Sequence, residues 1–210
     1  MNIPPYLIAE MVCLLIGIWR YKNLPAGPFR MLVWFLACIV SVEWYGLVAG
    51  RWFGGAIGMV FNFSVPLEYM FFVWFITRHI TSPIGRRFGH FYLLAFLGFM
   101  LLNNLFSKET GFHGIYMKIG ILGVLFFCCF YFAELLRKEE VVNPLLSPVF
   151  WICCGLFIFN IGEFVYGFGI AKLANDPKAW VAIFKALNSN LNVLLYSCIS
   201  VAMIMVSWRK

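Results

Sequence analysis

Charged residues are scarce in this chain. Only 12% of its 210 residues are Asp, Glu, Lys or Arg, about half the share found in a typical soluble domain. Hydrophobic residues make up 63% and aromatic residues 20%, and the mean hydropathy is +0.88. This composition excludes an ordinary soluble protein and indicates an integral membrane protein. We expect one transmembrane domain over residues 1–210, with no soluble appendage, in contact with membrane lipids.

The signatures of common catalytic and cofactor sites are also missing. The three histidines lack the HExxH spacing of zinc proteases, and neither GxSxG nor EExxxR occurs. Lys185 lies near the outer end of the last apolar stretch, whereas an opsin needs a lysine deep in that helix to hold retinal. We therefore expect no catalytic residue, metal or cofactor. A hydrolase that uses two carboxyl groups inside the membrane stays open as an alternative.

The cysteines give no disulfide or metal pattern. All seven lie inside apolar stretches, and no CxxC spacing occurs. Adjacent cysteines on a helix point about 100° apart, which does not suit a shared ligand. We interpret them as small apolar packing residues.

Long apolar stretches, separated by charged residues, Gly and Pro, dominate what is present. Most exceed the ~20 residues with which a helix crosses ~30 Å of hydrocarbon, and the alternation of a membrane barrel is absent. We predict an all-α polytopic membrane protein, a seven-transmembrane-helix bundle. The predicted helices cover residues 4–19, 29–50, 56–77, 89–106, 114–136, 148–170 and 181–207.

The distribution of Lys and Arg predicts the orientation. Ten of the 16 follow the first, third and fifth helices or end the chain. The positive-inside rule then places the N-terminus outside and the C-terminus in the cytoplasm, with the first helix an uncleaved span and no signal peptide. The ten residues are Arg20, Lys22, Arg30, Arg78, Arg86, Arg87, Arg137, Lys138, Arg209 and Lys210.

The predicted span ends carry residues that suit the lipid headgroup region. The net charge of +7 comes mostly from the cytoplasmic loops, where basic residues lie against anionic lipid heads, so no nucleic-acid partner is expected. Tryptophan is also common at this depth, and five of the eight lie near predicted span ends. These are Trp19, Trp52, Trp151, Trp180 and Trp208.

Three segments resemble an uncharacterised family of small bacterial inner-membrane proteins with seven transmembrane helices. They read FNFSVPLEYMFFVWF (61–75), NPLLSPVFWICCGLFIFNIGEF (143–164) and LNVLLYSCISVAMI (191–204), and the resemblance extends in order over nearly the whole chain. It implies a seven-helix fold in the bacterial inner membrane but no particular activity. The positions that match its recurring features are Asn62, Glu68, Pro148, Phe150, Trp151, Asn188 and Asn192.

Four glutamates lie inside predicted helices, where no Lys or Arg reaches a comparable depth. They are Glu10, Glu43, Glu68 and Glu163, on the first, second, third and sixth helices. An unpaired charge at mid-bilayer costs ~2.5–3.5 kcal/mol even on the lenient insertion scale. We therefore expect the four carboxyls to face inward, where they are protonated, hydrogen-bonded or neutralised by a bound cation.

Polar residues on three helices complete the predicted cavity. Helix three offers Ser64 on the face of Glu68, and Pro66 frees the backbone carbonyl of Asn62. Asn160 shares a face with Glu163 on helix six, and a polar stripe follows helix seven. The simpler interpretation is that each group only joins two helices by a hydrogen bond. The predicted ligand- or ion-binding residues are Glu10, Glu43, Asn62, Ser64, Glu68, Asn160, Glu163, Asn188, Asn192 and Tyr196.

Two kinds of function fit such a cavity in the outer half of the membrane. The first is a receptor- or sensor-like module that binds a small cationic or polar ligand and reports to a cytoplasmic or membrane signalling partner. The second is a transporter or channel in which the glutamates relay protons or cations. No repeat relates the first three helices to the last three, so we favour the receptor-like module.

Overall fold

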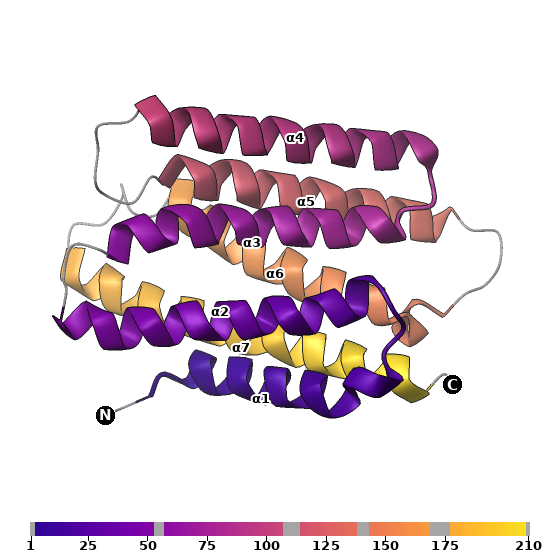
Figure 1. Ribbon diagram of the computed structural model, residues 1–210, viewed down its shortest axis with the longest axis horizontal. Helices are drawn as coiled ribbons and strands as arrows, with labels where there is room; N and C mark the ends of the chain where they lie inside the picture. Colours follow the sequence, from indigo (N-terminus) through magenta and orange to yellow (C-terminus); the bar gives the residue numbers. More distant parts are fainter. Residues whose placement is uncertain (1–2, 53–56, 107–113, 138–142, 169–176, 209–210) are drawn as a thin grey trace. The chain divides into compact units, whose positions relative to one another are not determined.

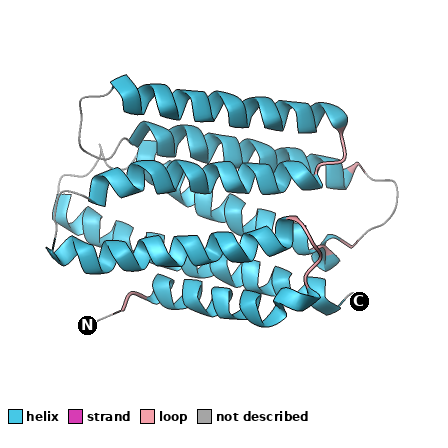
Figure 2. Ribbon diagram, in the orientation of Figure 1, coloured by secondary structure: helices cyan, strands magenta, loops and turns pink. Residues whose placement is uncertain are grey.

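The computed structural model of the chain describes residues 3–52, 57–106, 114–137, 143–168 and 177–208. These residues form seven α-helices and two short 3₁₀ helices, with no strand among them (Figure 2). The helices fall into two compact units. Unit 1 is drawn from residues 1–40 and 138–210, and unit 2 from residues 41–137. The all-helical prediction is confirmed.

Unit 1 is built around α7. Both α1 and α6 pack against this last helix, as Figure 1 shows within the unit (Figure 1). Proline begins each of these helices, which suits a first turn whose N–H groups have no partner inside the helix. The elements are α1 (Pro5–Arg20), η1 (Tyr21–Asn23), the first half of α2 (Pro28–Trp52), η2 (Pro144–Leu146), α6 (Pro148–Phe168) and α7 (Pro177–Trp208).

Unit 2 is centred on α3, which packs against both α4 and α5. Glycines let aromatic side chains approach the helix backbones closely. The ring of Tyr69 lies against Gly120, and that of Tyr92 against Gly123, where its hydroxyl also donates to the carbonyl of Ile119 at 2.9 Å. The elements are the second half of α2, α3 (Ile57–His79), α4 (Pro83–Phe106) and α5 (Gly114–Leu136).

Five of the helices are long and apolar enough to cross a membrane. The qualifying segments are Pro28–Val48, Val60–His79, Ile115–Leu136, Pro148–Val165 and Lys185–Val206. Large apolar side chains are also exposed along the helices, as expected where lipid replaces water; Leu94 is 70% exposed and Leu105 77%. The chain is therefore a membrane protein by length and composition. With 16 residues, α1 is shorter than the ~20 that a perpendicular span requires.

The fourth helix begins earlier than the sequence predicts. It starts at Pro83, six residues before the predicted residue 89, so that Arg86 and Arg87 belong to its first turns and not to a loop. The hydroxyl of Ser82 accepts a hydrogen bond from the Gly85 amide at 3.3 Å, which caps the helix. The other six predicted helices are found, with ends shifted by at most four residues; residues 169–170 of the sixth lie outside the described residues.

A carboxylate from α5 holds the turn between α3 and α4. Both oxygens of Glu134 accept hydrogen bonds from this turn: the Thr81 amide at 2.8 Å, the Thr81 hydroxyl at 3.0 Å and the Ser82 amide at 2.8 Å. Hydrogen bonds to an ionised acceptor are about twice as strong as neutral ones. Glu134 therefore closes unit 2 at one end, a role that the sequence did not reveal.

Replacing Glu134 by Ala should destabilise unit 2 by about 2–4 kcal/mol, because two amides and one hydroxyl lose a charged acceptor. Thermal unfolding of the purified protein, followed by tryptophan fluorescence, would show the lower midpoint. Arg137→Ala is the matched control, since Arg137 is exposed at the same end of α5. Equal midpoints for the two variants would mean that the turn does not depend on Glu134.

The tryptophans near predicted span ends are described only in part. Trp19 is 69% exposed in the last turn of α1. Trp151 lies in the first turn of α6 and donates from Nε1 to the Leu145 carbonyl at 2.8 Å. The side chains of Trp52, Trp180 and Trp208 lie outside the described ones. That these rings anchor the protein at the headgroups stays a prediction.

Candidate functional site

The candidate site lies in unit 1. One side of it is formed by α1, which packs against α7. The side chain of Ser200 lies beside the thiol of Cys13. A Cβ atom at Gly17 would lie 3.2 Å from the sulfur of Met203. The two helices are therefore parallel, with a fixed offset between contacting residues. That offset places Glu10, which is only 2% exposed, at about the level of Tyr196 on α7.

The packing of α6 on α7 sets the second side. A Cβ at Gly155 would lie 2.9 Å from the Cβ of Cys198, and Gly162 lies against the side chain of Leu191. Residue numbers rise along one helix as they fall along the other, so α6 and α7 are antiparallel. Glycine at these two positions lets the helix axes approach closely. The same register places Asn160 and Glu163 at the level of the Asn188–Asn192 turn of α7, about 90–150° around α6 from the two glycines.

The buried face of α6 carries two oxygen atoms that need a donor. Asn160 is 1% exposed and Glu163 3%. The amide nitrogen of Asn160 donates to the Leu156 carbonyl at 2.8 Å, but its Oδ1 has no hydrogen-bond partner among the described residues, nor has Oε1 of Glu163. A buried oxygen without a partner costs ~1–3 kcal/mol. Two such acceptors, one turn apart, favour a ligand that supplies a proton or a positive charge.

The α7 side of the site carries amides and hydroxyls. Asn192 donates from Nδ2 to the carbonyl of Asn188 at 3.0 Å and to the side-chain oxygen of the same residue. Ser200 donates from its hydroxyl to the Tyr196 carbonyl at 2.7 Å. Both asparagines are half-buried, and Tyr196 is 2% exposed. The polar stripe predicted on helix seven is thus hydrogen-bonded within the helix at the Asn188–Asn192 pair and at Ser200.

The two buried glutamates of unit 1 lie on helices that pack against two different faces of α7. Ser200 and Met203 mark the face of α7 that meets α1, and Leu191 and Cys198 the face that meets α6. At 3.6 residues per turn, these faces are about 160° apart, and Asn192 lies on the arc between them. Along the axis, the levels of the two glutamates differ by about 10 Å. That distance suits a small molecule better than one shared proton.

Four predicted site residues belong to unit 2. Asn62 is buried on the face of α3 that also carries Pro66 and Tyr69, the face that meets α5. Ser64 and Glu68 lie about 120–160° around the helix from Asn62. Glu68 is half-buried, as is Glu43 on α2, and the hydroxyl of Ser64 has no hydrogen-bond partner among the described residues.

Two outcomes follow for the predicted cavity. Asn62 does not share a face with Glu68, because the pair is separated by six residues, which is not a whole number of helical turns. Glu43 and Glu68 lie in one unit, and Glu163 in the other. The convergence of all four helices on one cavity therefore stays a prediction, whereas the unit 1 cluster rests on contacts within that unit.

Cys13 and Ser200 are parts of this cluster that the prediction left out. Cys13 was interpreted as an apolar packing residue; it is buried, and its thiol lies beside Ser200 across the α1–α7 contact. Its position three residues after Glu10, on the same helix face, is the signal that could have revealed it. All seven cysteines are free thiols. Within the described ranges, no three His, Cys, Asp or Glu side chains lie close enough together to hold a metal ion.

Comparisons with protein-family models, with curated proteins and with solved structures find no match to this chain. The resemblance to seven-helix bacterial inner-membrane proteins therefore stays a prediction from its three segments. The arguments for function depend on the geometry of the site alone.

Proposed function

We propose that this protein is a receptor- or sensor-like membrane module that binds a small cationic or hydrogen-bond-donating ligand between α1, α6 and α7. The observation that carries the proposal is a pair of buried oxygens on α6, Oδ1 of Asn160 and Oε1 of Glu163, that have no hydrogen-bond partner in the described part of the chain. In the register of the helices, the Asn188–Asn192 pair lies at the level of these oxygens, and Glu10 lies about 10 Å away along the axis. The state of the site passes to a signalling partner through the basic loops.

Helix–helix hydrogen bonding alone does not account for these two residues. Polar side chains that join membrane helices gain ~0.6 kcal/mol apiece by making hydrogen bonds across the contact. Oε1 of Glu163 makes no such bond among the described residues. An ionisable group in that position is costly, and intramembrane carboxyls generally mark ligand, ion or proton sites. Because both free groups are acceptors, an ammonium group or a protonated ligand fits better than an anion.

The same observation argues against a hydrolase. Acid–base catalysis by two carboxyl groups needs them within hydrogen-bond reach of each other or of one water. Glu163 has no hydrogen-bond partner at Oε1, and Glu10 lies about two helical turns away along the axis. The site therefore supports binding better than catalysis.

A proton- or cation-coupled transporter is the second candidate. Polar side chains continue along α7 from Asn188 through Asn192 and Tyr196 to Ser200, past the levels of both buried glutamates. A path for ions or protons needs such a row of polar side chains, whereas a closed binding site does not. The distinction is experimental: a transporter moves the ion that it binds, and a receptor does not.

Thermal stabilisation tests for binding. The purified protein would be heated with ammonium, methylammonium, sodium or potassium chloride at equal ionic strength, because a ligand that binds only the folded state raises the midpoint. We expect at least one of these cations to stabilise the protein. Absence of any cation-specific shift would contradict the proposal.

A flux measurement separates the two candidate functions. Proteoliposomes loaded with a pH-sensitive dye would be exposed to a gradient of the stabilising cation. The receptor-like function predicts binding without flux, and the transporter predicts flux that disappears in Glu163→Gln.

The proposed topology is seven spans in the bacterial inner membrane, with the N-terminus outside and the C-terminus in the cytoplasm. The parallel packing of α1 and α7 supports it, since Pro5 and Trp208 then lie at opposite ends of this helix pair. Reporter fusions after Arg20 and at the C-terminus should both report a cytoplasmic position. Reporters on opposite sides would contradict the topology.

A further inference from the structure

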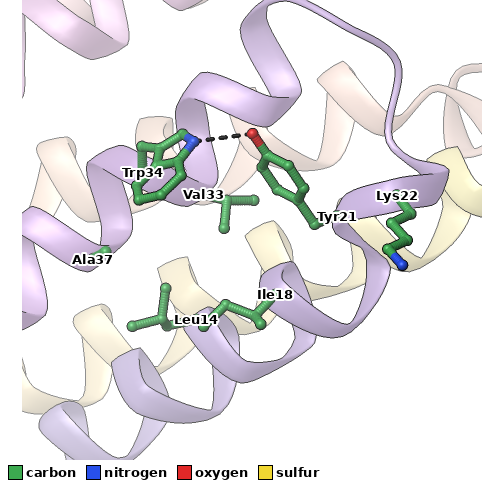
Figure 3. Close-up of a pocket in the computed structure, with 7 residues that line it drawn as sticks. All are labelled: Leu14, Ile18, Tyr21, Lys22, Val33, Trp34 and Ala37. Carbon is green, nitrogen blue, oxygen red and sulfur yellow. Dashed lines mark hydrogen bonds between the residues drawn. The ribbon is translucent and has the colours of Figure 1, made fainter.

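An open groove lies between α1 and the first half of α2. Its volume is about 400 Å³. Figure 3 shows Leu14 and Ile18 of α1 on one side and Val33, Trp34 and Ala37 of α2 on the other (Figure 3). These five residues are apolar, and Ile18 and Trp34 are 58% and 67% exposed. The groove is therefore apolar and open at the surface of the two helices.

The polar end of the groove is formed by η1. Tyr21 and Lys22 close it where α1 ends, and Lys22 is exposed. The hydroxyl of Tyr21 accepts a hydrogen bond from Nε1 of Trp34 at 3.0 Å. The Tyr21 hydroxyl can therefore still donate its own proton to another acceptor. Tyr21 and Trp34 have the amphipathic character of residues at the membrane–water interface.

The charged residues near this end of the groove are basic. Arg20, Lys22 and Arg30 lie within eleven residues, and the sequence from 11 to 42 contains no Asp or Glu. Two of the cations rest on aromatic rings: Cζ of Arg20 is 3.9 Å from the ring centroid of Trp19, and that of Arg30 is 5.5 Å from the Tyr21 ring. Arg30 also donates from Nε to the Leu24 carbonyl at 3.0 Å. The exposed Lys22 is the cation best placed for an outside anion.

We propose that this groove is a specific binding site for an anionic phospholipid, with an acyl chain between α1 and α2 and the headgroup phosphate at Lys22. Two features together select this occupant. An apolar groove on a membrane-facing helix pair matches an acyl chain, and a cationic end rich in Tyr and Trp matches a phosphate at headgroup depth. A zwitterionic lipid would fill the groove but gain less from the uncompensated positive charge.

Lipid titration tests the proposal. The full chain, freed of lipid in mild detergent, would be titrated with dioleoyl phosphatidylglycerol or with the phosphatidylcholine of the same chains. The midpoint of thermal unfolding gives the apparent affinity, and native mass spectrometry counts bound lipids. We expect one tightly bound phosphatidylglycerol. Lys22→Ala should lower the affinity for phosphatidylglycerol about fivefold, as expected for one basic residue at the surface, and leave the affinity for phosphatidylcholine unchanged.

Two further variants separate the chain from the headgroup. Ile18→Trp places a larger side chain into the groove from an exposed position, and it should abolish the tight binding of phosphatidylglycerol. Arg87→Ala removes an exposed cation from α4, in unit 2, and should bind lipid as the wild type does. Midpoints without lipid check that each variant folds. Glycerol phosphate, a headgroup without chains, should not compete.

Several results would overturn the proposal. Equal affinity for the two lipids would show that charge plays no part, and unchanged binding in Ile18→Trp would show that the groove holds no chain. Competition by glycerol phosphate would reduce the site to a surface anion site. A wild-type dimer that Ile18→Trp converts to monomer would show that a second copy covers the groove. None of these results bears on the cation site of unit 1.

Discussion

Replacing Gly120 by alanine should lower the stability of unit 2 by about 2–3 kcal/mol. The new methyl would meet Cβ, Cγ and Cδ2 of Tyr69, the part of that side chain nearest the α3 backbone. Tyr69 is buried and cannot move its ring base without moving α3. The helices must therefore separate, and other contacts of the α3–α5 interface are lost with them.

Two other glycines provide a graded control for Gly120→Ala. At Gly123 the methyl would meet the hydroxyl end of the Tyr92 ring, which can shift at the cost of its 2.9 Å bond to Ile119. At Gly98 no atom lies within 4 Å of the new methyl, so alanine should be neutral or should stabilise the helix by about 0.5–1 kcal/mol.

The midpoints of thermal unfolding should therefore decrease in the order Gly98→Ala, wild type, Gly123→Ala, Gly120→Ala. Tryptophan fluorescence or the fraction of monodisperse protein after heating measures them. If Gly120→Ala is as stable as Gly98→Ala, the close approach of α3 and α5 is not present in the protein.

Replacing Glu163 by glutamine should abolish cation binding at the proposed site while the protein folds normally. Glutamine keeps the shape and one acceptor oxygen but cannot carry charge. Loss of a buried charged partner typically costs ~2–5 kcal/mol, so the apparent affinity for the stabilising cation should fall at least about 30-fold. The unliganded protein should be as stable as the wild type, because Oε1 of Glu163 has no internal partner to lose.

Asn190→Ala is the matched control for Glu163→Gln. Asn190 lies at about the same level in the α6–α7 register, but its side chain is exposed. This variant should respond to the cation as the wild type does. Normal cation binding by Glu163→Gln would contradict the site, whereas loss of only the pH dependence of an otherwise normal response would show that Glu163 works as a protonated acid.

Glu68→Gln tests whether the two units share the site. If Glu68 meets Glu43 and Glu163 in one cavity, this variant should lose cation-dependent stabilisation as Glu163→Gln does. If the site is confined to unit 1, Glu68→Gln should respond as the wild type does. The comparison decides the predicted convergence, which contacts within each unit do not address.

The sequence by itself determined the all-helical class and the approximate helix positions. Hydrophobic stretches that are long enough to span a membrane leave few alternatives to the α-helix, because backbone groups in lipid must be hydrogen-bonded within the segment. Proline at residues 5, 28, 148 and 177 marks four helix starts closely. The spacing of Asn160 and Glu163 predicts one shared face on α6, and both residues are buried. These properties are local, since they depend on residues within a few turns of one helix.

Only the tertiary structure decided which helices meet and at what level. Arg86 and Arg87 resemble loop residues in the sequence, but α4 begins before them because Glu134, about fifty residues later, holds the preceding turn. Gly155 and Gly162 fix the depth of Glu163 against α7 by letting the backbones approach. Cys13 belongs to the polar cluster because it lies beside Ser200 of α7, a residue that is distant in the sequence. Such pairings depend on shape and contact between distant segments, and hydrophobic periodicity carries no information about either.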